Sequence, residues 1–192
     1  MKLIFIRHGQ TQGNFEGRYL GSTDESLRKE GAEFIREKAA RGEYPKAEIL
    51  WSSPMKRCLE TAALIYPDME ANIEDDLREC DFGKFEYKNY VDMSEDEDYR
   101  AWVNSSGTLP FPQGEDADEF RERSRQAFLK IVRRYDDDSV IAFTVHGGTM
   151  MAVFSKFEEP PVGYFDRQPK NGCGYVCEFD KTTEKLTLLE KI

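Results

Sequence analysis

Short apolar runs recur along the chain, and each of them stops abruptly at a polar residue. The clearest are Lys2 to Ile6, Ala47 to Trp51 and Ser139 to Val145. Runs of this length, rich in isoleucine, valine and phenylalanine and bounded by charge or turn residues, are typical of buried β-strands. The chain therefore has several strands that are apolar on both faces, as in a sheet covered by helices on both sides.

Segments with helical spacing of apolar residues lie between these strands. They are residues 27–42, 54–66 and 116–135 and a stretch that begins near Met150. Ser53 is a plausible N-cap, with Pro54 as the first helical residue of the second segment. Two C-terminal strands, 174–180 and 185–192, are expected to pair about residues 181–184. The alternation predicts an α/β protein: a three-layer α/β/α sandwich with a largely parallel central sheet.

Residues 86–116 interrupt this alternation with acidic runs, aromatic residues and prolines. We interpret the chain as a single domain, residues 1–192, with 86–116 as an inserted cap or lid that carries a short helix around Glu95 to Val103. A solvated irregular loop is the alternative interpretation. Its aromatic residues could wall a substrate pocket or belong to the core: Tyr87, Tyr90, Tyr99, Trp102 and Phe111.

The charge balance limits the possible partners. A net charge of -10 and a pI near 4.9 argue against broad binding to nucleic acids or anionic membranes. Without an apolar run long enough to span a bilayer or a recognisable signal peptide, the protein is expected to be cytoplasmic, with no membrane partner. Its four cysteines are then expected to be reduced thiols, and a zinc site is a minor alternative.

The chain has two histidines, and each follows an apolar strand and precedes a glycine. His8 follows Arg7, and His146 opens the stretch His-Gly-Gly-Thr. The carboxyl ends of parallel strands meet at one sheet edge, where ligands bind. A neutral imidazole can attack phosphorus, guanidinium groups such as that of Arg57 can stabilise the phosphoryl oxygens, and a carboxyl group such as that of Glu79 can protonate the leaving oxygen. Each residue taken alone is more often structural, and the combination is what favours a phosphoryl-transfer site.

The joint motif pattern resembles the histidine phosphatase superfamily, which includes the cofactor-dependent phosphoglycerate mutases. The pattern consists of Arg7-His8-Gly9 after the first strand, Asn14 downstream, Arg57 after Ser-Ser-Pro-Met-Lys, Leu-Arg-Glu-Cys-Asp-Phe-Gly around Glu79, and Val-His-Gly-Gly at His146. Gln10-Thr11 stands where Glu-Thr is commoner, which is a mild departure.

The resemblance implies a role for each of these residues. His8 would be the nucleophile that forms a phosphohistidine, and Glu79 would protonate the leaving oxygen and later activate water. The phosphoryl group would be bound by Arg7, Asn14, Arg57, His146 and the backbone at Gly147. Glu79 then needs a raised pKa, either from burial or from nearby carboxylates, of which the candidates are Glu74, Asp75, Asp76 and Asp81. The family needs no metal, and no cofactor is expected.

The compact chain and the sequence around Glu79 resemble the phosphatase branch, including α-ribazole phosphatase. The resemblance therefore implies a phosphomonoester hydrolase for a small phosphorylated metabolite, with α-ribazole 5'-phosphate and sugar phosphates as candidates. A cofactor-dependent phosphoglycerate mutase is the alternative within the family. The alternative outside enzymology is a regulatory protein that binds phosphate without turnover. A monomer or homodimer is expected.

Overall fold

Alternate residues of the first strand face two different helical layers. The computed structural model describes residues 1–105, 107 and 109–192 of the chain. In β1 (Lys2–Arg7), Leu3 and Phe5 join the larger buried apolar cluster, whereas Ile4 and Ile6 join a second one. This two-sided burial follows from the alternation of side chains along a strand. It explains why the strand is apolar throughout and has no polar face.

The strands form one sheet with the order β3-β2-β4-β1-β5-β6. Parallel pairing joins β1 to β4 (Val140–Val145), β4 to β2 (Ile49–Ser52) and β2 to β3 (Asn72–Ile73). On the other side of β1, β5 (Gly174–Asp180) and β6 (Lys185–Lys191) are antiparallel. The largely parallel sheet and the C-terminal pair are thus confirmed. The short β3 was not predicted, because both of its residues are exposed and show no apolar pattern.

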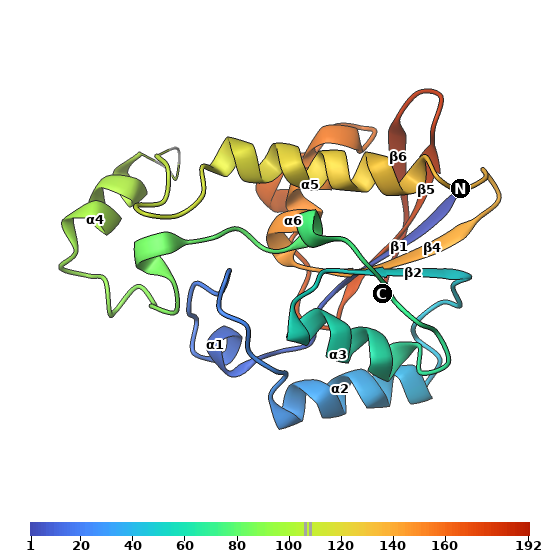
Figure 1. Ribbon diagram of the computed structural model, residues 1–192, viewed down its shortest axis with the longest axis horizontal. Helices are drawn as coiled ribbons and strands as arrows, with labels where there is room; N and C mark the ends of the chain where they lie inside the picture. Colours follow the sequence, from blue (N-terminus) through green and yellow to red (C-terminus); the bar gives the residue numbers. More distant parts are fainter. Residues whose placement is uncertain (106, 108) are drawn as a thin grey trace.

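Helices cover both faces of this sheet (Figure 1). On one face lie α5 (Ala117–Val132) and α6 (Gly147–Phe157), and on the other lie α2 (Lys29–Ala40) and α3 (Lys56–Ile65). Shorter elements connect them: α1 (Gln12–Phe15), η1 (Asp75–Leu77), η2 (Gly83–Phe85), α4 (Glu97–Asn104) and η3 (Tyr164–Arg167). The predicted three-layer α/β/α arrangement is confirmed.

The helix starts next to the sheet edge differ from the predicted ones. Ser53 is not the N-cap of α3 and Pro54 is not its first residue, because the helix begins at Lys56 with Met55 in the cap position. The Ser53 hydroxyl lies 2.7 Å from Nε2 of His146 and also accepts from the backbone N–H of Met55 over a longer distance of 3.4 Å. A buried polar partner has thus been added to a weak capping-type contact. Similarly, α6 begins at Gly147, before the expected Met150.

The segment 86–116 lies at one end of the molecule and carries α4, close to the expected helix (Figure 1). Residues 106 and 108 of this segment lie outside the described residues. Asp96 caps α4 by accepting hydrogen bonds from the backbone N–H groups of Asp98 and Tyr99. Phe111 is buried in a third apolar cluster together with Phe85, so part of this segment has a core of its own. Within the described ranges, no helix has both the length and the apolar character needed to cross a membrane.

Gly174 is expected to be essential for the pairing of β5 with β1. A Cβ atom at this position would lie 1.8 Å from the carbonyl oxygen of Phe5, which the backbone of β1 cannot avoid without moving. Gly174→Ala should therefore lower the free energy of unfolding by about 3 kcal/mol, measured by urea denaturation. Glu178→Ala, at an exposed position of the same strand, is the matched control. An unchanged midpoint for Gly174→Ala would contradict this account of the sheet.

Candidate active site

The two histidines lie side by side because β1 and β4 end in parallel register. Arg7 is paired with Val145, and the backbone N–H of His8 donates to the Val145 carbonyl over 2.9 Å. The residue directly after β4 is His146, and its ring centroid lies 5.2 Å from that of His8. The structure therefore brings together the two residues that the sequence placed at the same sheet edge.

His8 is held as a neutral imidazole with a defined tautomer. Its side chain is buried, and Nδ1 lies 2.7 Å from the Gly9 carbonyl oxygen. Because a carbonyl can only accept, this contact assigns the proton to Nδ1 and leaves a lone pair on Nε2. Burial, followed by the positive charges of Arg57 and Arg7, lowers the pKa of His8 well below its usual value. The side chain thus has the protonation state of a nucleophile near neutral pH.

Arg57 and His146 form a fully buried pair next to His8. Nε of Arg57 donates to Nδ1 of His146 over 3.3 Å, so the His146 proton is on Nε2, which donates to the Ser53 hydroxyl. The other guanidinium nitrogens of Arg57 donate to the carbonyls of Thr23 and Gly21, both over 2.8 Å. These contacts fix the Arg57 guanidinium, a buried cation, next to the two histidines. Burial, and after it the charge of Arg57, lowers the pKa of His146.

Arg7, the last residue of β1, supplies the second guanidinium of the site. Its Nη1 donates to the Pro169 carbonyl over 2.8 Å, while its buried Nε has no hydrogen-bond partner among the described residues. The guanidinium lies against the start of α6, where a Cβ atom on Gly147 would be 3.5 Å from Cζ of Arg7. An unpaired cationic donor next to a helix N-terminus is a suitable environment for an anion.

Glu79 faces this cationic group from the segment between η1 and η2. Its carboxylate accepts hydrogen bonds from the backbone N–H groups of Cys80 and Gly148, both over 3.0 Å. These bonds and the charges of Arg57 and Arg7 lower its pKa, but burial outweighs them and the net shift is upward. The sequence had left two causes open for a raised Glu79 pKa, burial and nearby carboxylates, and burial is the larger effect. A Cβ atom at Gly148 would lie 2.2 Å from a carboxylate oxygen of Glu79, so a side chain there would displace this carboxylate.

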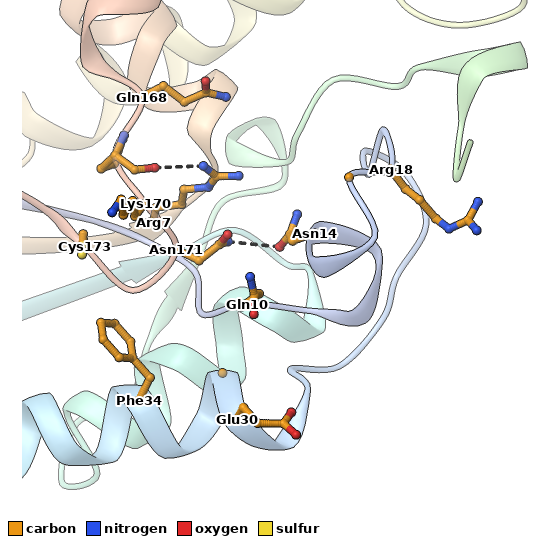
Figure 2. A pocket seen from close by; sticks show the side chains of 13 residues that line it. Arg7, Gln10, Asn14, Arg18, Glu30, Phe34, Gln168, Lys170, Asn171 and Cys173 are labelled. Carbon is orange, nitrogen blue, oxygen red and sulfur yellow. Dashed lines mark hydrogen bonds between the residues drawn. The ribbon is translucent and has the colours of Figure 1, made fainter. Parts of the chain in front are cut away.

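Asn14 lies at the rim, in a cavity of about 800 Å³ that also contains Arg7 (Figure 2). Oδ1 of Asn14 accepts a hydrogen bond from Nδ2 of Asn171 over 3.0 Å, and the same nitrogen lies 3.1 Å from the His8 carbonyl oxygen. Sequence reasoning missed Asn171. The sequence does contain a hint of its role, because Asn171 lies shortly before β5. Since β5 is antiparallel to β1, its start lies at the same sheet edge as the end of β1.

Arg123 on α5 holds the segment that carries Glu79. Its guanidinium donates to the carbonyls of Asp76, Arg78 and Glu79 over 2.9 to 3.0 Å and forms an ion pair with Glu115. The sequence carried no signal for this role, because an arginine in an amphipathic helix is usually a surface residue. The contacts fix the backbone from which the Glu79 side chain reaches the site.

The arrangement can bind a phosphoryl group and transfer it. Two guanidiniums and a helix N-terminus can neutralise the phosphoryl oxygens, Nε2 of His8 can attack, and a protonated Glu79 can supply a proton. Across residues 1–105, 107 and 109–192, no group of three or more His, Cys, Asp or Glu side chains is placed to hold a metal ion.

Curated relatives of the chain include phosphatases with different substrates in their names. A metal-independent phosphoserine phosphatase of Arabidopsis thaliana is 30% identical over 167 residues, which are 82% of this chain and 69% of that protein. The adenosylcobalamin/α-ribazole phosphatase of Escherichia coli is 23% identical over 193 aligned positions, covering 98% of this chain and 95% of that protein. The match thus extends over nearly the whole chain.

Solved structures agree with the fold described above. The crystal structure of the α-ribazole phosphatase from Shigella flexneri superimposes with a TM-score of 0.84 at 23% identity, covering 98% of this chain and 95% of that one. The model of the histidine phosphatase superfamily, branch 1, matches residues 3–191. The motif from Arg7 to Gly9 and the Val-His-Gly-Gly stretch at His146 lie within that match. The chain belongs to branch 1 of the histidine phosphatase superfamily.

Proposed function

We propose that the protein is a phosphomonoester hydrolase that acts through a phosphohistidine at His8. The observation that supports this most is the protonation pattern of the site. His8 is neutral with a free lone pair on Nε2, Arg7 and Arg57 are beside it, and burial favours the protonated form of Glu79. A site that only bound phosphate would gain nothing from a carboxyl group at this position, whose negative charge repels the ligand when ionised.

In the first step, the Nε2 lone pair of His8 attacks phosphorus as the bond to the leaving oxygen breaks. Glu79 transfers its proton to that oxygen, so a neutral alcohol departs and Glu79 becomes a carboxylate. Arg7 and Arg57 stabilise the negative charge on the other phosphoryl oxygens. The His8 Nδ1–H remains on the Gly9 carbonyl, and the new phosphohistidine is therefore an imidazolium.

In the second step, the Glu79 carboxylate takes a proton from water, and the resulting hydroxide attacks phosphorus. The bond between Nε2 and phosphorus breaks, and its electron pair returns to His8 as the lone pair of a neutral imidazole. Because Nδ1 keeps its proton, the departing group is neutral and leaves readily. The sum of the two steps is ester plus water giving alcohol plus inorganic phosphate, and Glu79 is again protonated.

The chain as a whole would form this catalytic unit. The family match over residues 3–191 supports a single catalytic domain, and the packing of Phe111 against Phe85 supports residues 86–116 as its cap. Asn14 and the backbone at Gly147 would assist in binding the phosphoryl group. Since relatives are named for phosphoserine and for adenosylcobalamin/α-ribazole, the proposed substrate is a small phosphorylated metabolite.

Release of inorganic phosphate in the presence of EDTA tests this proposal. A panel of p-nitrophenyl phosphate, O-phosphoserine, sugar phosphates, α-ribazole 5'-phosphate and 3-phosphoglycerate should show turnover of at least one ester without added metal. Isomerisation of 3-phosphoglycerate with a bisphosphoglycerate primer, and no phosphate release, would instead indicate a mutase. Saturable phosphate binding with neither reaction would indicate a phosphate-binding regulatory protein.

The raised pKa of Glu79 predicts a pH dependence that differs between leaving groups. Alkyl esters need the proton of Glu79, so their turnover should fall as pH rises through its pKa, whereas p-nitrophenyl phosphate leaves as an anion and needs little help. The ratio of kcat/KM for an alkyl ester to that for p-nitrophenyl phosphate should therefore decrease with rising pH. His8 takes part in both reactions, and its titration cancels in the ratio. A ratio independent of pH would contradict the acid role.

A further inference from the structure

A cavity of about 390 Å³ opens beside Glu79 and is walled mainly by rings. Its lining comes from five parts of the chain that are distant in sequence: the loop after α1, the segment that begins at Glu79, the 86–116 segment with the start of α5, α6, and η3 with Gln168. The aromatic members are Tyr19, Phe82, Trp102, Phe111, Phe120, Tyr164 and Phe165. This volume lies within the range of roughly 300 to 1,000 Å³ that small-molecule sites occupy.

The cavity is on the leaving-group side of the phosphoryl site. Glu79, which would protonate the leaving oxygen, lines it together with Gly148 and Gln168. Gln168 also lies next to the phosphoryl site, because a Cβ atom on Gly147 would be 3.4 Å from its Cγ. The described lining of the larger cavity around Arg7 and Asn14 does not include Glu79. Glu79 also lines a cavity of about 250 Å³ beside Arg78 and Asp81, which is smaller than small-molecule sites usually are. The alcohol half of a substrate would therefore extend toward the rings.

Beyond Glu79, the described wall offers no anionic partner for a cationic group of the substrate. Among the described lining residues, the charged side chains are Glu79 and Arg121. Arg121 pairs through Nη1 with a carboxylate oxygen of Asp118 over 2.6 Å and its guanidinium lies over the ring of Tyr164, while its buried Nε has no hydrogen-bond partner among the described residues. Burial raises the pKa of Tyr164 to about 12, so this phenol is neutral near pH 7. Because Glu79 acts as the acid and Arg121 is a cation, an ammonium entering the cavity would lose its hydration without gaining an anionic partner.

The rings form a fixed surface with an open rim. Phe82 and Phe111 are in edge-to-face contact with centroids 5.0 Å apart, and Trp102 lies 5.2 Å from Phe111. This group packs on the third buried cluster, which holds it in place. At the rim, the Phe165 side chain is 74% exposed. A large aromatic side chain left in solvent at a cavity mouth is suited to cover an apolar ligand.

We infer that the cavity binds an uncharged aromatic ring in the alcohol half of the substrate. This inference rests on the proposed hydrolase function, because it uses the position of the leaving oxygen at Glu79. Ring burial against Phe82, Trp102 and Phe111 provides the recognition, through apolar area and edge-to-face contacts. The ammonium group of an amino acid, such as the serine of phosphoserine, fits this wall poorly.

A matched set of alkyl esters tests the inference. The esters 2-phenylethyl phosphate and ethyl phosphate release alcohols of similar acidity and differ mainly in the ring, while O-phosphoserine adds two charges. We expect kcat/KM for 2-phenylethyl phosphate to exceed that for ethyl phosphate by roughly 30-fold, the selectivity expected from burying one ring. It should exceed that for O-phosphoserine by at least as much.

Variants of two exposed aromatic residues test whether the preference for the ring ester arises at this cavity. Phe165→Ala should reduce the ratio of the ring ester to ethyl phosphate about fivefold. Tyr90→Ala, at a residue 71% exposed that does not line the cavity, should leave the ratio unchanged. Equal kcat/KM for the three esters, or faster hydrolysis of O-phosphoserine, would overturn the inference but leave the hydrolase intact. No phosphate release from any ester, p-nitrophenyl phosphate included, would overturn the proposed function itself.

Discussion

Replacement of His8 by alanine is expected to lower kcat for p-nitrophenyl phosphate by about 10⁴-fold or more, the size of effect seen when a covalent nucleophile is removed. The reason is the loss of the lone pair on Nε2 of an imidazole that lies within the influence of the Arg57 and Arg7 charges. Alanine cannot form the nitrogen–phosphorus bond, and a good leaving group does not compensate for a missing nucleophile. The measurement is steady-state release of p-nitrophenol.

Two controls separate this effect from misfolding. The variant should keep a cooperative thermal transition, because the hydrogen bonds of Arg57 to the carbonyls of Gly21 and Thr23 do not involve His8. It should also still bind inorganic phosphate, since Arg7 and Arg57 remain. Activity above a tenth of the wild-type value in a folded variant would exclude His8 as the nucleophile.

Glu79→Gln is the prediction with the second largest effect. Glutamine has nearly the same shape and can still accept a backbone hydrogen bond, but it cannot donate a proton to the leaving oxygen. Hydrolysis of an alkyl phosphate should slow by roughly 10² to 10⁴-fold, the usual contribution of general acid catalysis. Hydrolysis of p-nitrophenyl phosphate should slow by about tenfold or less in its first step. The comparison requires kcat/KM, which reports steps up to the first irreversible one.

Glu74 provides a matched control for this substitution. It is a buried carboxylate on the same stretch of chain, but it pairs with Lys130 over 2.7 Å, away from the histidines. Glu74→Gln should leave the ratio of alkyl to p-nitrophenyl hydrolysis at its wild-type value. Equal slowing of both esters by Glu79→Gln would show that Glu79 does not act as the acid.

The sequence predicted the fold well because the fold depends on strong local patterns. The apolar runs before His8 and His146 are buried on both faces, and this burial is what a continuous apolar strand encodes. Parallel pairing of strands of similar length then places their ends together, so the proximity of the two histidines followed from topology. The two exposed residues of β3 carry no such pattern, and this strand was missed.

The parts of the site that sequence reasoning missed depend on contacts between distant segments. Ser53 was interpreted as a helix cap, but the cap position is Met55, and the shorter contact of the Ser53 hydroxyl is with His146, far along the chain. Asn171 and Arg123 support the site through hydrogen bonds to backbone carbonyls, which leave no residue pattern. The cause of the Glu79 pKa shift also required the structure, because burial in a site cannot be inferred from neighbouring residue types.

The phosphohistidine itself is the most direct test of the central claim. Rapid mixing with excess p-nitrophenyl phosphate, quenching in alkali and mass analysis of the peptides should show one phosphoryl adduct on the His8 peptide. Because a phosphorus–nitrogen bond is labile in acid, the adduct should disappear after acid treatment, and it should form and decay at rates compatible with kcat. Turnover without any adduct on His8, or an acid-stable adduct on another residue, would contradict the account.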